Sequence, residues 1–228
     1  YRFDTEQMNI AVVEHHLMRA GLARARERRE FSLHDQPQLD IASGAIIGAE
    51  ALLRWKHPQR GMVPPAHFIS IAEDSGHIVP IGEWVLQEAC RQAVNWQQAG
   101  LPELVIAVNL SAVQFKRSNL EMTVTRALTE SGLKPELLEL ELTESILIQD
   151  TESVLGTVHR LKALGVKLSI DDFGTGYSSL SYLSRFAVEK LKIDQSFVRD
   201  MTSNPGNAAI VRAIIQMAKS LNLKTIAE

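Results

Sequence analysis

Short apolar segments that alternate with longer amphipathic segments constrain the fold more than any other feature of this sequence. Segments with the length and apolar content of strands are 31–39, 45–55, 104–110, 137–143, 166–171, 188–193 and 223–227. Between them, apolar residues recur at helical spacing in 65–74, 81–98, 120–131, 151–164 and 208–221. Gly100, Gly132 and Gly165 follow three of these helical segments, where left-handed C-caps are expected. Strands that alternate with helices predict βαβ units and a parallel sheet.

Two architectures fit this alternation. Seven expected strands are one fewer than a closed (β/α)8 barrel needs, and 228 residues are slightly fewer than the roughly 250 typical of that fold. An open doubly wound sheet is the alternative, but no G-x-G-x-x-G segment follows the first strand, which removes the usual dinucleotide site. The chain starts at Tyr1 and stops at Glu228 inside a strand pattern. We therefore expect it to be part of a longer protein.

Charge and composition exclude several classes of protein. A net charge of -3 gives no electrostatic basis for binding a nucleic-acid polymer. No apolar run approaches the ~18 residues of a membrane span, so this segment is expected to make no membrane contact. No secretory signal is recognisable, and the single cysteine, Cys90, fits a reducing compartment, which predicts a cytoplasmic location. The charge-dense segment 24–30 is interpreted as a solvated helix face rather than a nucleic-acid patch.

Asp171 and Asp172 end an apolar strand and lead directly into the glycine-rich segment 173–179. Adjacent carboxylates repel each other, and burying either one without compensation is costly, so the pair suggests a cation site. The alternative is an Asp-rich helix cap, because Asp, Thr and Ser favour caps and turns. These residues alone leave both interpretations open.

Polar residues recur where the other expected strands end, which is where functional groups gather in parallel α/β folds. They are Glu50, Arg54, Asn109, Glu139, Glu141, Lys192 and Glu228, and alternation places Glu139 and Glu141 on one face. Each has a structural alternative: a wet strand face for Glu141, a surface position for Lys192, a turn for Asn109. Together the oxygen ligands indicate Mg²⁺ or Mn²⁺ rather than zinc. Two such ions would make an in-line phosphoryl displacement feasible, with Arg54 holding a phosphate oxygen.

These residues resemble the motifs of the EAL-domain family of cyclic di-GMP phosphodiesterases. The name-giving triplet is Glu50-Ala51-Leu52, and the match continues through VNLS, ELTES, DDFGTGYSSL, LKID and the terminal IAE. The resemblance implies a (β/α)8 TIM-like barrel with an antiparallel first strand, and with the final strand missing from this chain. It implies an enzyme that hydrolyses cyclic di-GMP to linear pGpG with two Mg²⁺ or Mn²⁺ ions. The alternatives are a catalytically weak or inactive cyclic di-GMP-binding receptor and, more weakly, a barrel phosphodiesterase for glycerol-type diesters.

The resemblance also assigns roles to individual residues. Expected metal ligands are Glu50, Asn109, Glu141, Asp171, Asp172 and Glu228, with Asp171 bridging the two ions. Expected catalytic residues are Lys192 and Asp172 at the attacking water, with Glu50 and Glu228. Expected substrate contacts are Gln36, Leu53, Arg54 and Asp172. Expected members of a control loop are Gly174, Thr175, Gly176, Tyr177 and Ser178, anchored by Glu144.

The resemblance further implies a domain order and partners. Residues 1–8 are expected to be the tail of an upstream GGDEF domain, 9–30 a connecting helix, and 31–228 a C-terminally incomplete EAL domain. Sensor domains upstream, and any membrane attachment through them, are expected in the full protein. Tyr177, Leu180 and Leu183 suggest a homodimer through the loop and helix after Asp172, or else barrel packing. Asp35 replaces the family's usual Tyr before Gln36, and either alters the base-stacking side of the site or faces outward.

Overall fold

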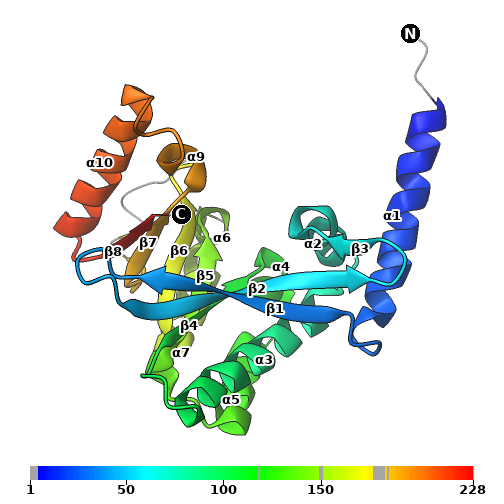
Figure 1. The fold of residues 1–228 in the computed structure, drawn as a ribbon, viewed down its shortest axis with the longest axis horizontal. Coiled ribbons are helices and arrows are strands. Elements are labelled where there is room, and N and C mark those ends of the chain that lie inside the picture. Colours follow the sequence, from blue (N-terminus) through cyan, green and yellow to red (C-terminus); the bar gives the residue numbers. More distant parts are fainter. Residues whose placement is uncertain (1–4, 118, 149–150, 177–182, 184, 228) are drawn as a thin grey trace.

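The computed structural model describes residues 5–117, 119–148, 151–176, 183 and 185–227, and it is an α/β fold built on one curled sheet (Figure 1). The strands are β1 Phe31–Leu39, β2 Ile46–His57, β3 Gly61–Val63, β4 Val105–Leu110, β5 Leu138–Thr143, β6 Lys167–Phe173, β7 Lys190–Ile193 and β8 Lys224–Ala227. The strand order is β1-β2-β4-β5-β6-β7-β8, and β3 pairs with β2. The seven expected strands are confirmed, and only the three-residue β3 was not predicted.

Strand direction confirms the expected TIM-like architecture. β1 and the short β3 run antiparallel to β2, and each neighbour along the order β2-β4-β5-β6-β7-β8 is parallel. Among the described residues β1 and β8 are the two edges, so the sheet is an open half-barrel. In this arrangement the carboxyl ends of β2 and β4 to β8 lie on the same side, and residues of distant sequence position meet there.

Helices connect the strands: α1 Thr5–Ala25, α2 Pro65–Asp74, α3 Ile78–Gln98, α4 Ala112–Arg117, α5 Leu120–Ser131, η1 Pro135–Leu137, α6 Glu144–Ile148, α7 Thr151–Ala163, α9 Gln195–Val198 and α10 Pro205–Ser220. The five expected long helices are confirmed. Helix α10 starts earlier than expected because the Asn204 side chain accepts hydrogen bonds from the N–H groups of Gly206 and Asn207. Short helices α4, α6 and α9 were not predicted, since four to six residues show no helical period.

The expected left-handed positions after three helices are confirmed. Gly100, Gly132 and Gly165 have φ values of 89°, 74° and 90°. Gly132 caps α5 by donating from its N–H to the carbonyl of Leu128. These glycines let each helix stop and the chain turn back into the next strand of the sheet.

Both faces of the sheet are covered or enclosed. In β5, Leu138, Leu140 and Leu142 are fully buried beneath the outer helices, while Glu139 and Glu141 point into the half-barrel and are also buried. The wet-face alternative for Glu141 is therefore wrong. The alternation in β5 separates an apolar helix-packing face from a polar interior, and this interior is where the site forms.

Helix α1 lies at one end of the β1–β2 hairpin, beside α2 (Figure 1). It packs through Met18, Leu22 and Ala25, which are buried. A Cβ at Gly21 would lie 3.2 Å from ring carbons of Trp55, so glycine permits this close approach. Residues 5–8, expected in the tail of a preceding domain, form the first part of α1, and residues 1–4 of that tail lie outside the described residues. No helix in the described ranges has the length and apolar character to cross a membrane.

Candidate metal centre

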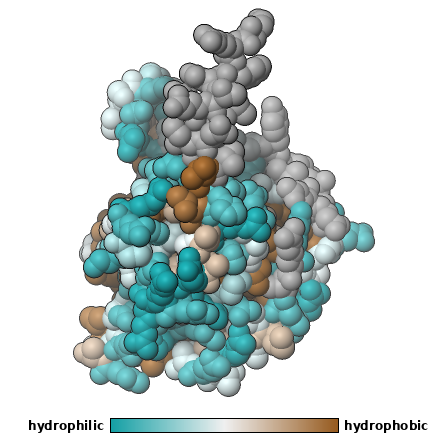
Figure 2. All heavy atoms as spheres, turned by 90° about the vertical axis from the view of Figure 1, so that its right-hand side faces the viewer, coloured by the Kyte–Doolittle hydropathy of each residue, from teal (hydrophilic) through white to brown (hydrophobic). Residues whose placement is uncertain are grey.

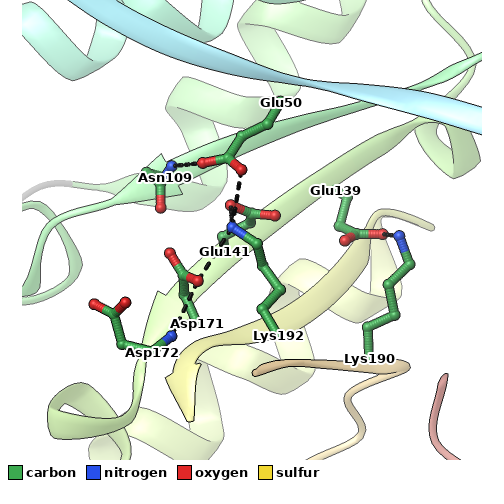
Figure 3. Close-up of polar contacts among 8 residues, drawn as sticks. All are labelled: Glu50, Asn109, Glu139, Glu141, Asp171, Asp172, Lys190 and Lys192. Carbon is green, nitrogen blue, oxygen red and sulfur yellow. Dashed lines mark hydrogen bonds and ion pairs between the residues drawn. The ribbon is translucent and has the colours of Figure 1, made fainter. Parts of the chain in front are cut away.

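Side chains from five strands converge inside the half-barrel (Figure 3). Glu50 comes from β2, Asn109 from β4, Glu141 from β5, Asp171 from β6 and Lys192 from β7. Glu50, Glu141, Asp171 and Lys192 are buried, whereas Asn109 is exposed at the open side of the cluster. The parallel register makes this possible, because Asn109 pairs with Glu141 and Thr143 pairs with Asp171 across neighbouring strands. The structure thus brings these five predicted site residues together.

The Lys192 ammonium lies at the centre of the cluster. Its Nζ donates hydrogen bonds to Glu50 Oε2 at 2.9 Å and to Glu141 Oε2 at 2.8 Å, and it lies 3.1 Å from Asp171 Oδ1. Asn109 Nδ2 donates to the other Glu50 oxygen, Oε1, at 2.6 Å. Lys192 is only 1% exposed, which excludes the surface-lysine alternative. One ammonium thus faces three carboxylates in a site of low solvent exposure.

The charge imbalance shifts the protonation of the cluster. Burial raises the pKa of Glu141 well above its ordinary value; Lys192 opposes this shift and the Glu50 charge adds to it. Burial opposes the charged form of Lys192, but Glu141, Asp171 and Glu50 outweigh it and raise the pKa of the ammonium. The cluster therefore carries a permanent cation and an excess of acidic groups, which favours a further cation.

The donor set fits a divalent cation of the Mg²⁺ type. One carboxylate oxygen each from Glu50, Glu141 and Asp171 can be chosen so that all lie within 4.8 Å of one another. Glu141 Oε1 is buried and has no hydrogen-bond partner among the described residues, although buried carboxylate oxygens are almost always satisfied. Carboxylate and amide oxygens are the ligands that Mg²⁺ and Mn²⁺ prefer. These residues therefore fit a hard divalent ion better than zinc.

Asp172 differs from its neighbour in conformation and direction. Its φ is 53°, a left-handed value that is uncommon for a non-glycine residue, and its side chain is exposed. Its backbone N–H donates to Asp171 Oδ1 at 3.0 Å, while its carboxylate points away from Lys192 (Figure 3). The two aspartates therefore serve different places, one inside the cluster and one at its rim. Backbone strain of this kind is concentrated at functional sites.

Asp194 was missed as a site residue, although the LKID segment contains it. Its pKa is lowered first by the Ser196 side chain, and also by the Ser196 backbone N–H and a side-chain hydrogen bond with Asp172. Asp194 Oδ1 accepts from Ser196 N at 2.9 Å and caps α9. Its position one residue beyond the end of β7, directly after Lys192-Ile193, was the available signal. The exposed Asp172 and the half-buried Asp194 together form an acidic pair beside the buried cluster.

The predicted substrate residues lie on two different faces of β1 and β2. Gln36 pairs with Glu50, and strand alternation puts Arg54 on that same face; Gln36 is exposed and Arg54 half-buried. Arg54 Nη1 donates to the Leu53 carbonyl at 3.0 Å. Leu53 lies on the opposite face and packs against the apolar core. The alternation thus separates the Leu53 side chain from Gln36 and Arg54.

Asp35 also lies on the face opposite Gln36. It is half-buried, its Oδ1 has no partner within the described part of the chain, and it pairs across the strands with the buried Ala51. Burial raises the pKa of Asp35. The His34 charge lowers this pKa, and the Glu88 charge on α3 raises it. The side chain is therefore directed to the helix-packing side, away from the carboxylate cluster. This agrees with the expectation that Asp35 faces outward, although the side chain is half-buried on that face.

A second buried ion pair lies one layer deeper in the half-barrel. Lys190 Nζ is 2.7 Å from Glu139 Oε2, and these residues precede Lys192 and Glu141 by two positions on the same strands (Figure 3). Glu139 is fully buried and Lys190 is 9% exposed. Because this pair balances one carboxylate with one ammonium, it leaves no excess charge for an ion. The pair lies next to the acidic cluster, on the same face of β5 and β7.

Glu144 holds the glycine-rich segment after β6. Its Oε2 accepts hydrogen bonds from Gly174 N at 3.2 Å and Gly176 N at 3.4 Å. A Cβ at Gly176 would lie 2.8 Å from Glu144 Oε1, so a side chain at this position would displace the Glu144 carboxylate. Thr175 Oγ1 donates to the Asp172 carbonyl at 2.9 Å, which links the segment to the aspartate doublet.

Several predicted residues cannot be placed or lie elsewhere. Tyr177, Ser178, Leu180 and Glu228 lie outside the described residues. Leu183, the third apolar residue of the expected dimer surface, is 5% exposed and belongs to the core. Its burial agrees with the barrel-packing alternative.

Comparison with known proteins adds an independent finding. The family model described as EAL domain matches residues 19–228, which includes the C-terminal part of α1. The "Bifunctional diguanylate cyclase/cyclic di-GMP phosphodiesterase MucR" of Pseudomonas aeruginosa is 46% identical over 228 residues, which are 100% of this chain and 33% of that protein. The "Cyclic di-GMP phosphodiesterase PdeR" of Escherichia coli is 41% identical over 224 residues, 98% of this chain and 34% of that protein. This chain thus spans about a third of these relatives.

The fold matches solved structures as well. The structure described as "PaMucR Phosphodiesterase, c-di-GMP complex" superposes with a TM-score of 0.89 at 47% identity, covering 92% of this chain and 85% of that one.

Proposed function

This chain belongs to the EAL-domain family, and we propose that it is a metal-dependent phosphodiesterase that hydrolyses cyclic di-GMP to linear pGpG. The observation that carries the proposal is the buried cluster of Glu50, Glu141 and Asp171, in which one Glu141 oxygen has no partner among the described residues. The names of the relatives MucR and PdeR, and the c-di-GMP complex of MucR, support the choice of substrate.

We propose two Mg²⁺ or Mn²⁺ ions as cofactors, held by Glu50, Asn109, Glu141 and Asp171 on one side and by Asp171 and Asp172 on the other. Glu228 is proposed as a further ligand from outside the described residues. When bound, such ions supply Lewis-acid polarisation of the phosphodiester and lower the pKa of the attacking water. The Asp172 conformation supports a rim position for the second ion, because its exposed carboxylate is directed away from Lys192.

Asn109 and Lys192 are proposed to orient the groups that take part in the reaction. Asn109 orients Glu50 through its 2.6 Å hydrogen bond, which leaves the other Glu50 oxygen to Lys192. Lys192 holds three carboxylates in place and is proposed to contact the attacking water together with Asp172. The Lys192 ammonium is also suited to stabilise negative charge that develops on a phosphate oxygen.

Gln36 and Arg54 are proposed to contact cyclic di-GMP, because both lie on the face of the hairpin that carries Glu50. Arg54 is half-buried and offers a planar guanidinium that binds a phosphate with two parallel hydrogen bonds. Glu144 and the segment 174–178 are proposed to control the cluster, since Thr175 and Gly174 connect Glu144 to the Asp172 backbone.

We further propose that this chain is the phosphodiesterase part of a longer protein with GGDEF and sensor domains upstream. The bifunctional name of MucR, of which the chain spans 33%, supports this arrangement. We also propose that the chain forms a homodimer through the segment after Asp172. A cytoplasmic location is proposed as well.

The decisive experiment measures release of pGpG from cyclic di-GMP by the full-length protein with Mg²⁺ or Mn²⁺. Wild type is expected to turn over, and Glu50→Ala is expected to lose activity by roughly 100-fold or more, because a ligand of the ion is removed. Glu103→Ala is the matched control, since this exposed glutamate only forms a surface ion pair with Lys134. Tight cyclic di-GMP binding without any turnover would instead establish the receptor alternative.

A further inference from the structure

A cavity of about 200 Å³ lies between α1 and the turn that follows β2. Its lining includes Arg24 from the last turn of α1, Arg28 from the turn that follows α1, His57 from the end of β2, and Arg60 from the turn after β2. His57 is seven residues beyond Glu50 on β2, which is about 23 Å along an extended strand. The cavity is therefore separate from the carboxylate cluster. Figure 2 shows the face on which α1 lies, and hydrophilic side chains dominate its lower part.

The lining is strongly basic and its guanidinium groups are largely unused. Three arginines, Arg24, Arg28 and Arg60, face a single lining carboxylate, Glu30. Within the described part of the chain, neither Arg24 nor Arg28 forms an ion pair with a carboxylate. The ion pair between Arg60 Nη1 and Glu14 is long, at 3.5 Å, and both side chains are exposed.

Glu30 is already engaged in the structure of the domain. Its Oε2 accepts the indole hydrogen bond of Trp55 at 3.0 Å, and Trp55 is fully buried. Glu30 is therefore held by Trp55, and within the described part of the chain Arg24 and Arg28 have no ion pair with a carboxylate. The expectation of a solvated helix face over 24–30 is therefore wrong in part, because α1 ends at Ala25 and three residues of the segment, Arg24, Arg28 and Glu30, line this cavity.

Histidine adds a hydrogen-bond donor to the same cavity. His57 Nδ1 accepts from the Gln59 N–H at 3.2 Å, so in the neutral ring Nε2 carries the proton. This Nε2 lies beside Gly21, where a Cβ would be 3.5 Å away, and Gly21 is itself part of the lining. The absence of a side chain at Gly21 keeps this donor accessible from the cavity.

We propose that this cavity binds a soluble phosphate-bearing small molecule. Guanidinium groups match the geometry of phosphate oxygens with paired hydrogen bonds, and three of them with one imidazole N–H can surround a single phosphate. About 200 Å³ is enough for a phosphate with a small organic group and too little for a cyclic dinucleotide. The site goes beyond the proposed phosphodiesterase activity and uses none of its residues.

A ligand at this place would join two parts of the fold. Arg24 and Arg28 belong to the end of α1 and the turn after it, whereas His57 and Arg60 belong to the hairpin of β2 and β3. A phosphate that contacts both sets therefore strengthens the packing of α1 on the domain. Binding is expected to require residues from both sides.

The test is isothermal titration of the full-length protein with inorganic phosphate and with pyrophosphate, at low ionic strength and without divalent ions. One saturable site per chain is expected. Arg24→Gln with Arg28→Gln, and separately Arg60→Gln, should each weaken binding by about tenfold or more, since charge-assisted hydrogen bonds are lost. Arg19→Gln with Arg26→Gln is the matched control: it removes the same charge from the same exposed segment but lies outside the lining.

Equal weakening by both double variants would overturn the proposal, because the effect would then be one of general charge. Absence of saturable binding would also overturn it. Glu50→Gln should leave the titration unchanged, and loss of binding in this variant would assign the phosphate to the carboxylate cluster instead. Binding to vesicles that contain phosphatidic acid is measured as well. Binding to these vesicles without binding to pyrophosphate would refute a soluble ligand. Near-ultraviolet circular dichroism and Tm confirm that all variants are folded.

Discussion

Two buried lysines on β7 provide the sharpest test of the metal centre. Lys192 lies among three carboxylates, whereas Lys190 neutralises Glu139 alone. Lys192→Met and Lys190→Met remove the same charge from positions two residues apart, and both residues are buried. The two substitutions therefore differ mainly in which carboxylates they leave without a partner.

The expected losses of stability follow from burial. Removing one partner of a buried ion pair costs about 3–5 kcal/mol, because the remaining charge stays buried and uncompensated. Lys190→Met leaves one such carboxylate and Lys192→Met leaves three, so Lys192→Met should lie at the upper end of that range. Protonation of a carboxylate limits the loss in both variants.

Divalent ions should separate the two variants. An ion at 100 times its Kd stabilises the folded state by about 2.7 kcal/mol. In Lys192→Met, Mn²⁺ no longer competes with the ammonium for Glu50 and Glu141, so it should restore more stability than it adds to wild type. Lys190→Met should gain no more than wild type does, because Glu139 lies outside the acidic cluster.

The assay is urea unfolding followed by far-ultraviolet circular dichroism, in EDTA and in Mn²⁺, with turnover of cyclic di-GMP measured alongside. Lys192→Met is expected to regain stability in Mn²⁺ while remaining inactive, because the ammonium proposed at the attacking water is missing. Equal stabilisation of both variants by Mn²⁺ would contradict a metal centre at Glu50, Glu141 and Asp171. A Lys192→Met variant as stable in EDTA as wild type would also contradict it, since the three carboxylates would then need no cation.

Three further outcomes follow from the same geometry. The pKa of Glu141 in the folded protein is raised above its ordinary 4.5, so the stability of the metal-free protein should fall as pH rises from about 4.5 through the raised pKa. Calorimetry should show that Mn²⁺ affinity rises with pH, because a carboxylate ligand must be deprotonated. Gly176→Ala places a Cβ 2.8 Å from Glu144 Oε1, so Mn²⁺ titration should show roughly tenfold weaker binding with little change in Tm. Glu139→Leu with Lys190→Met should return urea stability to within about 1 kcal/mol of wild type or above it, because an apolar pair replaces a buried ion pair.

Much of the fold could be predicted because the relevant signals are local. Periodicity identified seven strands and the long helices. Gly132 predicted a helix end, and its φ of 74° is the left-handed value expected there. Helices of four to six residues, such as α6 and α9, have too few turns to show a period. In the site, the strand-end pattern identified Glu50, Glu141 and Lys192 as candidates. It missed Asp194, whose hydrogen bond to Asp172 depends on how the ends of β6 and β7 approach each other.

The sequence by itself thus determined the order of strands and helices and the chemical character of the strand ends, because both depend on residues that are close together in the chain. Only the tertiary structure decided which groups meet. Lys192 reaches Glu50 across 142 positions because the sheet curls, and the same curl buries Glu139 with Lys190. Asp35 was directed away from the cluster by strand alternation and the position of α3. The packing of α1 against β2 turned a charged helix end into a basic cavity, since concave sites form only between elements.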